Sequence, residues 1–117
     1  MKKSIATLFV SLLLVFGCAV APTSPAQAVF IAKQDYAVAL TTAVAYKRLP
    51  PCTGTSTVVC SDLHLVDQIQ KADDAAYALL NGAEKTVRLG GSNMQLAVNA
   101  AQQAVLALSS IVATLAK

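Results

Sequence analysis

Residues 90–117 read GGSNMQLAVNAAQQAVLALSSIVATLAK, and their apolar positions decide the fold that we expect. Apolar residues recur alternately four and three positions apart, which is the spacing of a helix face that packs against other helices. Gly90 and Gly91 end the preceding element, and Ser92 with Gln95 forms a capping-box signature for the new helix. The apolar seam consists of Met94, Val98, Ala101, Val105, Leu108, Val112 and Leu115.

A first helix is expected over residues 30–48, upstream of this seam. Its apolar residues also recur every three or four positions, from Val29 through Tyr36 to Tyr46. Pro50 and Pro51 end it, because proline supplies no N–H and disfavours helical geometry in the residue before it.

A second helix is expected over residues 62–89, with Ser61 as its N-cap. Asn81-Gly82 is a pair that often forms turns, but the apolar phase continues through it, which favours an unbroken helix. Asp73 interrupts the apolar stripe, and we expect it to reach Tyr77 or a residue on another helix.

The segment between these two helices, residues 50–61, reads PPCTGTSTVVCS and is predicted to be a loop. It holds Cys52 and Cys60, which pair as a disulfide if the protein is exported to an oxidising compartment. The expected fold is therefore all-α: a small three-helix up-down bundle, or an extended helical hairpin with a packed N-terminal helix, with one disulfide-closed loop between the first two helices.

The beginning of the chain has the order of a secretory signal. Lys2 and Lys3 are followed by an uncharged apolar run over residues 5–21, and Ala26 and Ala28 then form a small-x-small cleavage site. Cleavage after Ala28 divides the chain into a signal segment, residues 1–28, and an alanine-rich helical domain, residues 29–117.

Residues 14–18, LVFGC, offer a second interpretation because they resemble a bacterial lipobox, although Phe16 is bulkier than the small residue usual at its position. Lipidation of Cys18 would make it the mature N-terminus and leave residues 19–28 as a tether. An uncleaved anchor is a third alternative, but the apolar run is short compared with the roughly 20 residues that span a membrane.

Charge and chemistry exclude several function classes. Of the nine lysines and arginines, two lie in the signal segment, so seven remain against six acids. Nucleic-acid binding is not expected, because it needs basic residues clustered on one face. We also expect no enzyme and no cofactor, since His64 is the single histidine and Cys52 and Cys60 are expected to be oxidised.

A metal site could be drawn from Cys52, Cys60, His64 and Asp62, because sulfur and imidazole suit zinc or copper. The spacing lacks the paired pattern that makes such an interpretation specific. We therefore expect a disulfide beside an exposed histidine and no metal.

The last predicted helix stands out because residues 90–116 contain no charged residue, which is unusual for a soluble surface helix. We interpret it as a packing interface, within the bundle or between copies. The interface candidates are Met94, Val98, Val105, Leu108, Val112 and Leu115.

These features favour an exported, non-catalytic protein of the bacterial periplasm or outer membrane. We expect it to act through helix-mediated contact with a protein partner or with itself, and to meet a membrane only through an N-terminal lipid anchor. One alternative is a lipid-anchored accessory of envelope disruption, such as a phage-type lysis lipoprotein, which requires a lipidated Cys18. Another is a periplasmic metal-binding or small-ligand protein that uses His64 and the adjacent loop.

Overall fold

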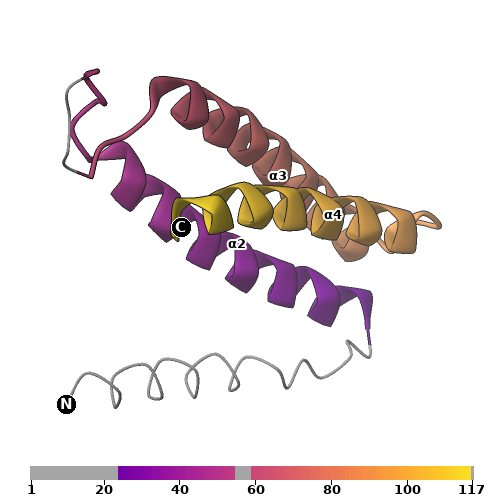
Figure 1. Cartoon of the computed structure of the whole chain (residues 1–117). Helices are drawn as coiled ribbons and strands as arrows, with labels where there is room; N and C mark the ends of the chain where they lie inside the picture. The colour runs from indigo at the N-terminus through magenta and orange to yellow at the C-terminus, as the bar shows by residue number, and fades with distance from the viewer. Residues whose placement is uncertain (1–23, 55–58, 117) are drawn as a thin grey trace, which may run out of the picture.

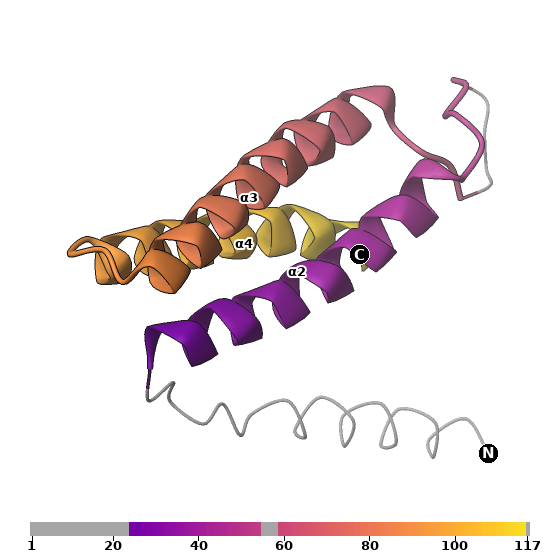
Figure 2. The ribbon, with the colours of Figure 1, turned by 180° about the vertical axis from the view of Figure 1, so that it is seen from behind.

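The computed structural model describes residues 24–54 and 59–116, which form three packed helices (Figures 1 and 2). Helix α2 spans Pro25–Lys47, α3 spans Leu63–Leu89, and α4 spans Met94–Ala113 and continues as a short 3-10 turn, η2, over Thr114–Ala116. The chain runs up, down and up, so that α2 and α4 point the same way (Figure 1). The expected all-α bundle and its disulfide-closed loop are confirmed.

Helix α2 begins earlier than the sequence pattern predicted. Ser24 is its N-cap, with the Ser24 hydroxyl accepting from the Gln27 N–H at 3.2 Å, and Pro25 occupies the first helical position. Proline fits there because its fixed φ suits a helix and its missing N–H would lack an intrahelical partner anyway. The expected start at residue 30 was wrong, because Ser24 and Pro25 together begin the helix about one and a half turns earlier.

Helix α3 is capped by a different residue from the one predicted. The carboxylate of Asp62 accepts from the N–H groups of His64 and Leu65 at 2.8 and 3.0 Å, so that Asp62 is the N-cap. Ser61 is instead buried, and its hydroxyl donates to the carbonyl of Leu49 at 2.9 Å. Helix α3 is continuous through Asn81-Gly82, as expected.

The turn from α3 to α4 depends on Gly90, which has a φ of 67° and ends α3 in the left-handed conformation. This conformation costs glycine little because it has no Cβ. The capping box expected from Ser92 and Gln95 does not form: Asn93 is the N-cap of α4, and it makes no side-chain cap hydrogen bond.

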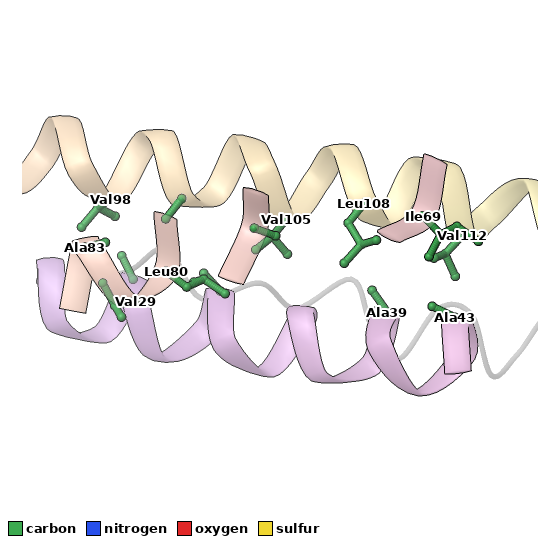
Figure 3. Packing of buried hydrophobic residues seen from close by; sticks show 14 residues of the cluster. Val29, Ala39, Ala43, Ile69, Leu80, Ala83, Val98, Val105, Leu108 and Val112 are labelled. Atoms are coloured by element: carbon green, nitrogen blue, oxygen red, sulfur yellow. The ribbon is translucent and has the colours of Figure 1, made fainter. Parts of the chain in front are cut away.

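The core lies between the three helices (Figure 3). Helix α4 packs most extensively against α3. Half of the buried hydrophobic residues among those described are alanines, which allow helices to approach closely but bury little area each. Leu108 and Val98 of α4 are the largest side chains that are almost completely enclosed. The core is therefore thin and centred on α4.

The loop between α2 and α3 is closed by the Cys52–Cys60 disulfide. Backbone hydrogen bonds close it further, from the Cys52 N–H to the Ser61 carbonyl at 2.9 Å and from the Ser61 N–H to the Pro50 carbonyl at 2.8 Å. The hydroxyl of Tyr46 accepts from the N–H of Asp62 at 2.8 Å, which ties the end of α2 to the start of α3.

Candidate functional site: a groove between the first and last helices

The uncharged seam of α4 lies inside the bundle. Of the interface candidates, Val98, Val105, Leu108 and Val112 are buried, and Met94 and Leu115 are partly buried. Within this structure the seam packs against α2 and α3. It is therefore an interface within the bundle, which is one of the two roles that the sequence analysis proposed. A contact with another molecule would therefore also need exposed residues outside this seam.

A groove of about 670 Å³ runs along the outer side of the α2–α4 pair. Its floor includes the buried residues Ala32, Ala39 and Val105. Val38 of α2 and Leu106 of α4 also line it, with 65% and 66% of their surfaces exposed. The groove is thus an apolar hollow with large apolar side chains at its walls, the kind of surface that binds other molecules.

Sequence reasoning missed this groove. A signal was present, because Leu106 lies off the buried seam of α4, but singly exposed apolar residues are normal on proteins. Only the packing of α2 beside α4 brings Val38 and Leu106 to one hollow.

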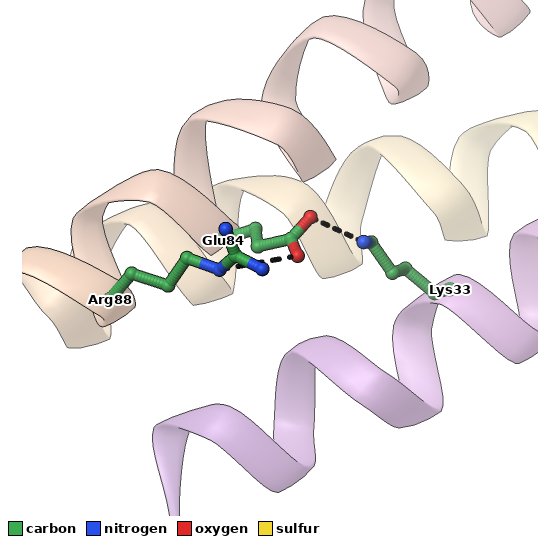
Figure 4. Close-up of polar contacts among 3 residues, drawn as sticks. All are labelled: Lys33, Glu84 and Arg88. Carbon is green, nitrogen blue, oxygen red and sulfur yellow. Dashed lines mark hydrogen bonds and ion pairs between the residues drawn. The ribbon is translucent and has the colours of Figure 1, made fainter.

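A polar cluster joins α2 to α3 on another part of the surface (Figure 4). The ammonium of Lys33 forms an ion pair with Glu84, and the Arg88 guanidinium lies 3.7 Å from the other oxygen of that carboxylate. The hydrogen bond and charge of Lys33 lower the pKa of Glu84 below its ordinary value, and Arg88 adds to this effect. All three groups are partly open to water and engaged with one another, so they serve as a latch between helices.

A second contact between the same helices is formed by Tyr36 and Asp73. The Tyr36 hydroxyl donates to the Asp73 carboxylate at 2.6 Å, which confirms that Asp73 reaches another helix. Burial, together with the hydrogen bond and charge of Asp73, raises the pKa of Tyr36 well above its ordinary value. The phenol therefore stays protonated and acts as a structural donor.

The residues considered for a metal site are not arranged as one. Cys52 and Cys60 are joined in the disulfide, and His64 is exposed in the first turn of α3. Within residues 24–54 and 59–116, no three His, Cys, Asp or Glu side chains lie close enough together to hold a metal ion.

The predicted cleavage residues belong to the first turn of α2. Ala28 is 5% exposed and its N–H bonds to the Ser24 carbonyl at 3.0 Å, and the next residue, Val29, is 6% exposed. Cleavage after Ala28 would remove the cap and place a positive α-ammonium at the helix N-terminus, where the helix dipole disfavours it. Cys18 and the lipobox lie outside the described residues, as does the apolar run over residues 5–21.

Among the described helices, α4 is long and apolar enough to cross a membrane by length and composition. The core helix of a soluble protein meets the same criteria, and α4 has its seam in the core of this bundle. Asn99 and Gln103 are exposed on its outer side, where they would be costly in lipid.

No protein-family model matches the sequence, no curated protein matches it, and no solved structure matches it. The structure describes a small all-α domain with a disulfide-closed loop and an open groove between two parallel helices.

Proposed function

We propose that this chain is an exported, non-catalytic protein of the bacterial envelope that acts by helix-mediated protein contact, with the α2–α4 groove as its contact site. The observation that carries the proposal is the groove itself, which exposes Val38 and Leu106 beside an uncharged helix. Interface centres are depleted of charged residues and rich in apolar ones, and this face has that composition.

Export is supported by the order of the N-terminal segment and by the Cys52–Cys60 disulfide. Disulfides persist in oxidising compartments such as the periplasm and are rare in the cytosol. The small alanine-rich core agrees with this, because small domains with thin cores commonly depend on disulfides.

Site-specific crosslinking in intact cells tests the contact. A photoreactive residue at position 106, in the groove, should give crosslinked species in the envelope fraction. The same residue at position 96 is the matched control, because Leu96 lies on the same helix, is 71% exposed and does not line the groove. Equal crosslinking from both positions, or none from either, would contradict the proposed contact site.

Anchoring by a lipid at Cys18 is a second proposal, and the first turn of α2 favours it. A mature chain that begins at Cys18 keeps Ser24 and Ala28, which cap and fill the first turn, whereas one that begins at Val29 loses both. Loss of an N-cap serine costs about 1 kcal/mol. We therefore expect the wild-type protein to incorporate labelled palmitate and the Cys18→Ser variant not to. A wild-type protein without label would contradict the proposed lipid anchor.

A further inference from the structure

The end of the bundle where α2 begins exposes large apolar side chains from all three helices. Phe30 lies near the start of α2, Leu89 is the last residue of α3 and Leu96 lies in the first turn of α4. Their exposed fractions are 61%, 75% and 71%. In both views α2 begins beside the turn between α3 and α4, so that these three residues share one end of the molecule (Figures 1 and 2).

Basic side chains lie directly beside this apolar surface. Phe30 of α2 lines a shallow pocket of about 240 Å³ together with Val87 and Arg88 of α3. The Lys33–Glu84 ion pair lies in the same pocket. Surfaces that bind the membrane–water interface combine Phe or Leu side chains with Lys or Arg in this way.

The charge distinguishes this end from the opposite one, which also exposes apolar residues, Val59 and Leu63. Residues 24–34 and 82–99 form the end where α2 begins and contain three basic residues and one acidic residue. Residues 42–73, toward the opposite end, contain three of each, with His64 neutral. The charged residues at the first end are Lys33, Glu84, Lys85 and Arg88. A net positive end complements an anionic surface.

The rest of the chain joins the bundle at this same end, because Ser24 caps the start of α2. Cys18 lies six residues before Ser24, and six residues extend over at most about 20 Å. A lipid on Cys18 would therefore hold this end close to a membrane. The 27 residues of α3 extend about 40 Å at 1.5 Å per residue, so the opposite end can lie well away from it.

We propose that this end of the bundle rests on an anionic membrane surface. Phe30, Leu89 and Leu96 lie at the boundary between headgroups and acyl chains, and Lys85 and Arg88 lie among the lipid phosphates. This contact goes beyond the proposed protein contact, because none of these five residues lines the α2–α4 groove. It also goes beyond a lipid anchor, since the folded domain itself touches the membrane.

Photocrosslinking in intact cells tests the membrane contact. A photoreactive residue at position 89 should form adducts with phospholipid, detected by labelled lipid phosphate. The same residue at position 63 is the matched control, because Leu63 is the first residue of α3, is 70% exposed and lies toward the opposite end. We expect at least about fivefold more lipid adduct from position 89, because only that end reaches the interface.

Reconstitution measures the dependence on lipid charge. The processed protein, purified from the envelope, is reconstituted into phosphatidylcholine vesicles with and without phosphatidylglycerol. The anionic lipid should raise the adduct yield at position 89, and Lys85→Gln should lower it by up to about fivefold, the contribution of one basic residue near such a surface. Lys71→Gln is the same change in the other half of α3 and should leave the yield unchanged, because Lys71 pairs with Asp67 at 2.7 Å. Circular dichroism and an intact disulfide verify that the variants are folded.

Equal lipid adducts from positions 89 and 63, or none from position 89, overturn the proposal. A yield that responds neither to phosphatidylglycerol nor to Lys85→Gln also overturns it, because the surface is then not recognised by its charge. Adducts of position 89 with a protein instead of lipid would make this end a protein interface. None of these results bears on the groove, which is tested by protein crosslinks from position 106. A probe at position 96 should react with lipid, so it remains a control for those protein crosslinks.

Discussion

At the scale of single residues, Tyr36 shows how α2 is held against α3. Its hydroxyl donates to Asp73 at 2.6 Å, and both side chains are half-buried. Tyr36→Phe keeps the ring but removes the donor from the carboxylate, so we expect a loss of about 1–3 kcal/mol in unfolding free energy. Urea unfolding followed by circular dichroism measures it. Tyr77→Phe is the control, because Tyr77 is 60% exposed. An equal loss of unfolding free energy in both variants would show that the Tyr36–Asp73 hydrogen bond does not stabilise the fold.

The latch of Lys33, Glu84 and Arg88 should contribute a pH-dependent part of the stability. Because Lys33 lowers the pKa of Glu84 in the folded state, their ion pair contributes stability above the carboxyl's unfolded pKa of about 4.5. That contribution is lost as the pH falls through the lower pKa that Glu84 has in the folded state. The difference in stability between wild type and Lys33→Ala should therefore be largest near neutral pH and shrink on acidification. A difference that stays constant from pH 7 to pH 3 would contradict the ion pair's role.

At the scale of elements, one glycine inside α3 and one at its C-terminal end should respond to the same substitution in opposite directions. Gly82 lies inside the helix, and a Cβ added there meets nothing within 4 Å, so Gly82→Ala should stabilise by about 1 kcal/mol. Gly90 has a φ of 67°, which a side chain disfavours, so Gly90→Ala should destabilise by about 1 kcal/mol. Thermal unfolding compares them directly. Two shifts of the same sign would contradict this assignment of the helix end.

The three helices were predictable because their apolar residues repeat at helical spacing, and the seam of α4 was the clearest case. Helix ends were less predictable, because several polar residues compete for the same cap. Asp62 caps α3 because Ser61 is turned inward by its bond to Leu49. The start of α2 at Pro25 was hidden, because Ala26 and Ala28 have the spacing of a cleavage motif and also suit the first turn of a helix.

The groove was beyond sequence reasoning for a different reason. Its walls come from two helices that are far apart in the chain, and the lateral position of α2 on α4 follows from the whole packing. The seam residues were expected to form an interface within the bundle or between copies, and they fill the core. The exposed Leu106 could not be singled out from the sequence, because single exposed leucines are normal on protein surfaces.

At the scale of the whole molecule, stability depends on an alanine-rich core and one covalent link. Closing a loop between Cys52 and Cys60, eight residues apart, stabilises a fold by about 2–3 kcal/mol on the chain-entropy model. We expect reduction to lower the midpoint of urea unfolding by a corresponding amount. Cys52→Ser/Cys60→Ser provides the control, because a reductant should not change its midpoint. Unchanged stability on reducing the wild type would show that the loop is already fixed by its hydrogen bonds.

Export is the central proposal, because an oxidising compartment would allow the disulfide to form and export would bring the groove to the envelope. The most direct test is the intact mass of the protein recovered from cells, with and without thiol alkylation. We predict a chain shortened at its N-terminus, with Ser24 retained, and with Cys52 and Cys60 protected from alkylation. A full-length chain recovered from the cytosol with both thiols alkylated would contradict the account.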